Sequence, residues 1–235
     1  MSPASPRMRV VAYALSAAWS VTACSGSGFV QEVERATELR GTEQSDEAVY
    51  RDLIAQLLQQ EKYYAALAHI EEHQRSLGAD PRLSLYEARA LYGLRLDGQA
   101  KAIFLTLRDT AYGAEAHHGL GLIDARDAEL QQAIEHFILA VRARPTNVAM
   151  RNDLGFALLR AGRTEDARLQ LSTALELEPS NQRARTNLML LMLIRGEEQS
   201  ARQLAESVGM TDSELTQLRD QAERLRATIV PSTGG

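Results

Sequence analysis

The sequence is poor in cysteine and in aromatic residues, and both shortages limit what the protein can be. Only one of its 235 residues is cysteine, which excludes an intramolecular disulfide. Phe, Trp and Tyr make up 5% of the chain, whereas Ala, Leu, Glu, Gln and Arg are abundant, and this composition favours helix throughout. The formal net charge is −5, and an acidic chain argues against nucleic acid as the main partner.

The sequence also lacks the usual signatures of a catalytic site. It has no phosphate-binding loop and no serine or cysteine nucleophile in a recognisable setting. The stretch His69-Ile70-Glu71-Glu72-His73 matches an H-x-x-E-H zinc pattern, and its two histidines share a helix face. No third ligand is evident nearby, and the repeat register below places the stretch on a solvated convex face. We therefore expect no enzyme, no catalytic residue, no metal site and no cofactor, with a zinc metalloenzyme as the weakest alternative.

Residues 114–181 contain one pattern twice, with a period of 34 residues. The corresponding positions are Leu120 and Leu154, Gly121 and Gly155, Ala133 and Ala167, Phe137 and Leu171, Ala140 and Ala174, and Pro145 and Pro179. This period, with small residues at fixed offsets and a final proline, is typical of stacked helix–turn–helix repeats. The small residues suit a helix crossing, because larger side chains would hold the two backbones apart. The pattern resembles the tetratricopeptide repeat (TPR) family.

The same register, extended in both directions, predicts the domain organisation. We expect about five all-α repeats at 47–209, which begin near residues 47, 81, 114, 148 and 182. The TPR resemblance implies that they form a right-handed superhelical solenoid. A capping helix follows at 210–228, and 229–235 is a frayed tail.

Local signals mark where the helices begin and end. The predicted helix starts are Asp80-Pro81, Asn147, Asn181 and the capping box of Thr211 with Glu214. Glycine tolerates the left-handed conformation that ends a helix. We therefore expect the turns inside three repeats at Gly98, Gly162 and Gly196.

Residues 1–23 have the composition of a secretion signal. Arg7 and Arg9 precede a mostly apolar run at 10–21, and small residues follow it. A run of about 12 residues is too short to cross a hydrocarbon core of about 30 Å as a helix.

The single cysteine, Cys24, follows directly after this segment. Val21-Thr22-Ala23-Cys24 resembles the lipobox of bacterial lipoproteins, with an ordinary cleavage site as the alternative. The resemblance implies a lipid on Cys24, and Ser25 after the cysteine implies the periplasmic face of the outer membrane. Residues 24–46 are then the lipidated N-terminus and a tether, which begins with flexible Ser and Gly.

In TPR proteins one face of the first helix of each repeat lines a concave groove. The resemblance implies the following partner-binding residues here: Arg89, Tyr92, His118, Leu122, Arg126, Asn152, Phe156, Leu159, Arg160, Leu190 and Leu193. This groove is mostly apolar with an arginine rim, which suits an amphipathic helix. It differs from the basic carboxylate clamp of chaperone-binding TPR proteins, which needs paired Lys and Asn. The alternative is that some of these side chains only contact the neighbouring helix.

The order of lipobox, tether, about five repeats and short cap resembles the TPR lipoproteins of the tight-adherence (Flp) pilus machinery, the TadD family. The most similar stretches are 152–163 and 184–196. This resemblance implies a pilotin that binds the outer-membrane secretin and helps to localise or assemble the pilus machinery. The alternative is another periplasmic TPR lipoprotein, such as a type IVa pilotin or an adaptor for envelope or peptidoglycan enzymes.

Overall fold

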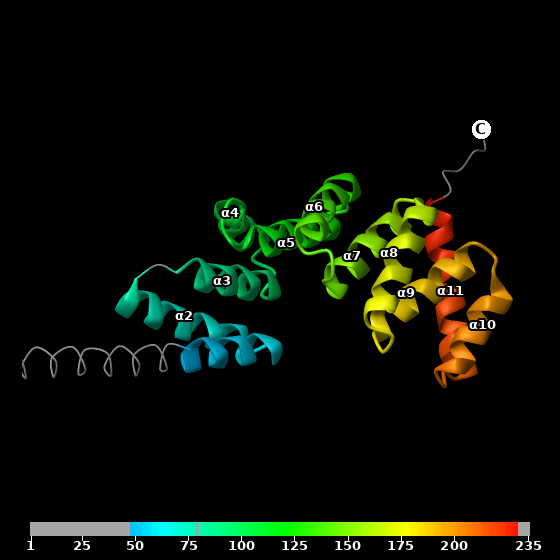
Figure 1. Ribbon diagram of the computed structural model, residues 1–235, viewed down its shortest axis with the longest axis horizontal. Helices are drawn as coiled ribbons and strands as arrows, with labels where there is room; N and C mark the ends of the chain where they lie inside the picture. Colours follow the sequence, from blue (N-terminus) through cyan, green and yellow to red (C-terminus); the bar gives the residue numbers. More distant parts are fainter. Residues whose placement is uncertain (1–47, 79, 230–235) are drawn as a thin grey trace, which may run out of the picture. The chain divides into compact units, whose positions relative to one another are not determined.

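The computed structural model describes residues 48–78 and 80–229, and within these ranges all regular structure is helical (Figure 1). Residues 48–59 are helical. The further helices are α2 (Tyr63–Leu77), α3 (Pro81–Gly93), α4 (Asp97–Leu107), α5 (Gly113–Arg126), α6 (Leu130–Ala143), α7 (Val148–Arg160), α8 (Thr164–Leu177), α9 (Gln182–Ile194), α10 (Glu198–Ser207) and α11 (Asp212–Ile229). The predicted signal segment, Cys24 and the tether lie outside the described residues, as does the tail beyond Ile229.

Consecutive helices pack in pairs, and the pairs stack along the chain. The tightest contacts join α3 with α4, α5 with α6, and α7 with α8. The second helix of each of these pairs also packs on the first helix of the next pair. The predicted all-α array of helix–turn–helix repeats is therefore confirmed. None of the described helices is long and apolar enough to cross a membrane.

The repeated glycines lie where two helices of a pair come closest. A Cβ atom on Gly121 of α5 would lie 2.7 Å from the ring of Phe137 in α6. A Cβ on Gly155 of α7 would lie 2.7 Å from Cγ of Leu171 in α8 and 3.4 Å from the carbonyl oxygen of Ala167. Any side chain here would overlap atoms of a close-packed interior. The close crossing explains why both repeats have glycine at this position.

The apolar core extends along the array. One cluster joins the helical segment at 48–59 to α2 and α3, a second joins α3, α4 and α5, and a third runs from α5 to α11. Each pair of helices thus buries its apolar side chains against its neighbours, as stacked repeats do.

The helix starts are formed as predicted. Asp80 Oδ1 accepts a hydrogen bond from the Arg82 amide at 2.8 Å, and Asn147 and Asn181 cap α7 and α9 in the same way. At α11 the Thr211 amide donates to Oε2 of Glu214, at 2.8 Å. These side chains satisfy amide groups that have no partner inside the helix.

The turns inside the repeats agree with the prediction at Gly162 and Gly196 but not at Gly98. Gly162 and Gly196 have φ of 73° and 78°. Gly98 lies inside α4, and the left-handed residue of that repeat is Arg95, with φ of 64°. Glu61 and Ala128 occupy the same place in their repeats, with φ of 57° and 65°. The position in the repeat therefore determines where the left-handed residue lies. Only two of these five turns have glycine at that position.

Candidate partner-binding groove

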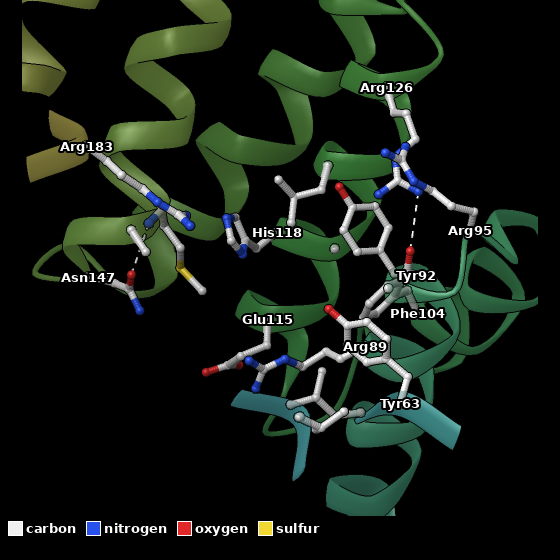
Figure 2. A pocket seen from close by; sticks show the side chains of 17 residues that line it. Tyr63, Arg89, Tyr92, Arg95, Phe104, Glu115, His118, Arg126, Asn147 and Arg183 are labelled. Atoms are coloured by element: carbon white, nitrogen blue, oxygen red, sulfur yellow. Dashed lines mark hydrogen bonds between the residues drawn. The ribbon is translucent and has the colours of Figure 1, made fainter. Parts of the chain in front are cut away.

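The first helices of successive pairs form the wall of a hollow of about 620 Å³ (Figure 2). Five of the predicted groove residues line it: Arg89 and Tyr92 of α3, and His118, Leu122 and Arg126 of α5. Asn147 and Met150 contribute from the start of α7, and Arg183 from the start of α9. Residues from consecutive repeats, including Leu58 and Tyr63 of the first, therefore reach one cavity.

The groove continues along α5 and α7 as two smaller hollows. One, of about 240 Å³, is lined by Tyr92, Leu122, Phe156 and Arg160 among others. The other, of about 390 Å³, lies over α7 and α9 and includes Asn152 and Phe156. Because Leu122 lines the first two hollows and Phe156 the last two, the three form one continuous surface.

Three predicted groove residues do not lie in this open surface. Leu159, Leu190 and Leu193 are 0%, 1% and 5% exposed. Leu190 stands at the repeat position of Leu122 and Phe156, which are partly exposed. The difference is caused by α11, which packs on α9 and reaches α7. The capping helix therefore covers the C-terminal part of the face that the register assigned to a partner, and these three leucines are buried inside the chain.

The helix α11 is amphipathic and is held on α9 by both apolar and polar contacts. Its residues Leu215, Leu218 and Ala222 are buried in the same cluster as the leucines of α9. Arg226 donates from Nη2 to the carbonyl oxygen of Leu193 at 2.6 Å, and from Nε to that of Ile194 at 3.0 Å. These bonds add a side-chain donor to carbonyl groups at the end of α9, of which that of Leu193 also accepts from the Gly196 amide at 3.0 Å.

Arg126 and Arg160 serve a similar purpose between earlier repeats. Arg160 Nη1 donates to the carbonyl oxygen of Ala125 at 3.0 Å. Arg126 stacks on the ring of Tyr92 with its Cζ 3.7 Å from the centroid, and its Nη1 donates to Asp97 at 2.6 Å. Both arginines lie at the predicted rim, but their charged groups also join neighbouring repeats.

Polar side chains connect the first helices across the groove floor. His118 Nε2 lies 2.7 Å from Oδ2 of Asp153, and Asn187 Nδ2 donates to Oδ1 of Asn152 at 2.8 Å. Each pair is separated by 35 residues in sequence. Asn152 is 4% exposed, and its Nδ2 also donates to Oδ1 of Asp153 at 3.1 Å. Asp153 and Asn187 were not among the predicted residues, although each lies one repeat plus one residue after a predicted groove residue, His118 or Asn152, and this spacing could have identified them.

The zinc-like stretch at 69–73 has a different environment from the one predicted. His73 is 6% exposed and packs against Tyr50, with the ring centroids 5.1 Å apart. His69 Nδ1 lies 2.9 Å from the hydroxyl oxygen of Tyr50. His73 therefore faces the preceding helix, and a solvated location for it is wrong. Among the described residues, no three or more His, Cys, Asp or Glu side chains are grouped to hold a metal ion.

A second histidine pair lies outside the groove, between α5 and α6. Nδ1 of His117 and Nδ1 of His136 are 3.1 Å apart, and Asp124 is 3.6 Å from His136 and 3.0 Å from Lys101. Burial lowers the pKa of both histidines. The charge of His136 lowers the pKa of His117 further, whereas Asp124 opposes the shift at His136. In balance, the pKa of both histidines is lowered, which favours the neutral form of the two rings.

Stacked helix pairs with a continuous hollow along their first helices define a helical-repeat scaffold of the type that binds other proteins. No family model matches the chain. It is 32% identical over 187 residues to TPR repeat-containing protein PA4299 of Pseudomonas aeruginosa, a match that covers 79% of this chain and 74% of that protein. The chain therefore belongs to the TPR repeat-containing proteins.

Solved structures show the same fold. The TPR protein TTC0263 of Thermus thermophilus has a TM-score of 0.56 and 23% identity, over 76% of this chain and 98% of that one. MamA 41-end from Desulfovibrio magneticus RS-1 has a TM-score of 0.54 and 19% identity, over 74% and 94%. At these identities the similarity establishes the fold alone.

Proposed function

We propose that this TPR protein is a lipid-anchored adaptor of the outer membrane, which binds an amphipathic segment of a pilus secretin in its open groove. The proposed partner is the secretin of the tight-adherence (Flp) system, and the proposed role is that of a pilotin. The sequence resemblance at 152–163 and 184–196 supports the secretin as the partner. The lipobox at Cys24 supports the location at the outer membrane.

The observation that carries the binding mode is the position of α11. This helix of 18 residues lies on the face of α9 that corresponds to the open face of α5 and α7. It buries Leu215 and Leu218 and adds arginine contacts to carbonyl groups. The array therefore already binds one amphipathic helix within its own chain. A partner helix can use the same chemistry on Leu122 and Phe156, where the face remains open.

The test is a titration of the full chain with the C-terminal region of the cognate secretin, comparing wild type with the double variant Leu122→Arg/Phe156→Arg. Burying one large apolar side chain contributes about 1.5–3 kcal/mol, and an unpaired charge against an apolar helix adds a further penalty. Because about 1.4 kcal/mol is tenfold, we expect the double variant to bind more than about a hundredfold more weakly.

Two controls accompany this titration. Circular dichroism checks that the variant keeps its helices, since both side chains are partly exposed in the wild type. Leu139→Arg, on the exposed face of α6 outside the hollows, controls for the addition of charge. Wild-type affinity in a folded double variant would remove the groove as the binding site. Absence of secretin binding by the wild type would refute the pilotin role.

A further inference from the structure

The hollow of about 620 Å³ carries positive charge in a chain that is acidic overall. Four arginines line it, Arg89, Arg95, Arg126 and Arg183, against a single carboxylate, Glu115. The whole chain has a formal net charge of −5. Oppositely charged surfaces favour association and select against partners of the same sign. The local charge of this hollow is therefore a property of the site and not of the average surface.

These arginines surround the hollow from different repeats. Arg89 belongs to α3, Arg95 to the turn after α3, and Arg183 to the start of α9. Figure 2 shows Arg183 on the opposite side of the hollow from Arg95, with Arg89 on a third side. An acidic group that enters the hollow is therefore approached by guanidinium groups from several directions.

Three of the four guanidinium groups are available. Arg126 is paired with Asp97 and stacked on Tyr92. By contrast, Arg89, Arg95 and Arg183 are exposed, and their guanidinium groups form no hydrogen bond or ion pair with any residue in 48–78 or 80–229. Arg168 of α8 and Arg195 at the end of α9 share Glu197. Arginines with carboxylate partners are thus common in this fold, and the three in the hollow lack them.

The neighbouring hollow has a different character. It is lined by Leu122, Ala125 and Phe156, and both of its arginines have partners. Arg160 donates to the carbonyl oxygen of Ala125, and Arg126 pairs with Asp97. The groove is therefore basic over α3 and the beginnings of α7 and α9, and apolar along α5 and α7.

We propose that the groove selects an acidic amphipathic helix, whose carboxylates lie among Arg89, Arg95 and Arg183 while its apolar face contacts Leu122 and Phe156. This inference rests on the proposed function of the groove and specifies the chemistry of the partner segment. Arginine suits this task because its planar group binds carboxylates through two parallel hydrogen bonds.

Three synthetic helices that differ only in charge test the selection. Each has the 18 residues of α11 in length and leucines at the spacing of Leu215, Leu218, Ala222 and Leu225, with Glu, Gln or Lys at the flanking positions. Fluorescence anisotropy measures their binding to the full chain at about 50 mM and about 300 mM salt. We expect the Glu helix to bind about tenfold more tightly than the Gln helix at low salt, with the Lys helix weakest. The difference decreases at high salt, because ions screen exposed charges.

Charge reversal assigns the effect to the hollow. Arg89→Glu/Arg183→Glu is expected to prefer the Lys helix to the Glu helix. Arg142→Glu, at an exposed position of α6 outside the hollows, is the matched control and keeps the wild-type preference. Circular dichroism verifies that both variants are folded.

Several results would overturn the inference: equal binding of the three helices, no binding of any of them, an unchanged preference in Arg89→Glu/Arg183→Glu, or tighter binding of a single-stranded oligonucleotide than of the Glu helix. If one of these occurs while Leu122→Arg/Phe156→Arg still loses secretin binding, only the charge selection fails. If that double variant binds secretin like wild type, the proposed function fails instead.

Discussion

Substituting one glycine at a helix crossing by alanine destabilises this protein, although alanine is the better helix former. In the interior of a helix, replacing glycine by alanine stabilises by about 1 kcal/mol. At Gly155 the added Cβ lies 2.7 Å from Cγ and 2.9 Å from Cδ2 of Leu171, a fully buried side chain. Overpacking of this type costs about 1–3 kcal/mol. The cost of overpacking exceeds the gain in helix propensity, so we expect Gly155→Ala to lower the free energy of unfolding by about 1 kcal/mol.

The same substitution at Gly98 is the matched control. Gly98 also lies in a helix, but a Cβ there meets no atom within 4 Å. Only the reduced freedom of the unfolded chain remains, and it stabilises by about 0.4–1 kcal/mol. The two variants therefore differ in the sign of their effect, although their chemistry is identical.

Urea denaturation followed by circular dichroism measures both effects, with thermal melting as a second assay. For a chain of this size, about 1 kcal/mol shifts Tm by about 2–4 °C. We expect Gly155→Ala to melt below wild type and Gly98→Ala to melt slightly above it. If Gly155→Ala is as stable as wild type, the close approach of α7 and α8 does not constrain this position and the reasoning is refuted.

Three further outcomes are expected. Cys24→Ser abolishes lipidation and outer-membrane fractionation while the helical spectrum is kept; a mutant that still fractionates with the membrane would show that another feature anchors the chain. Arg226→Ala weakens the attachment of α11 through the lost bonds to Leu193 and Ile194 and lowers stability by about 1 kcal/mol in urea denaturation, whereas Arg224→Ala, at an exposed position of the same helix, leaves it unchanged. Because the folded-state pKa values of His117 and His136 are lowered, their contribution to stability is complete above the unfolded pKa of about 6.5 and is lost as pH falls below it. The variant His117→Gln/His136→Gln is therefore expected to lose less unfolding free energy than wild type between about pH 7.5 and about pH 5. An equal dependence of stability on pH in the variant and in wild type would contradict the assignment.

The spacing of small residues was sufficient to predict the helix pairs. Gly121 and Gly155 mark crossings that only a glycine fits, and Asp80 and Asn147 cap the helices that follow them. These signals are local, since they depend on contacts within one repeat or on the first turn of one helix. These signals recur with the repeat period. The sequence alone therefore determined the type of fold and most of the helix starts.

Tertiary packing decided which of the equivalent positions remain open. Phe156 and Leu190 have the same place in their repeats, but Leu190 is buried because α11 lies on α9. Likewise, no local pattern shows that His73 contacts Tyr50, or that Arg95 takes the left-handed turn in place of Gly98. The repeat period gives the order of the helices, but it does not predict these individual contacts and turns. The period therefore determines the array, whereas the accessible groove and its charges depend on how the final helix and neighbouring repeats pack.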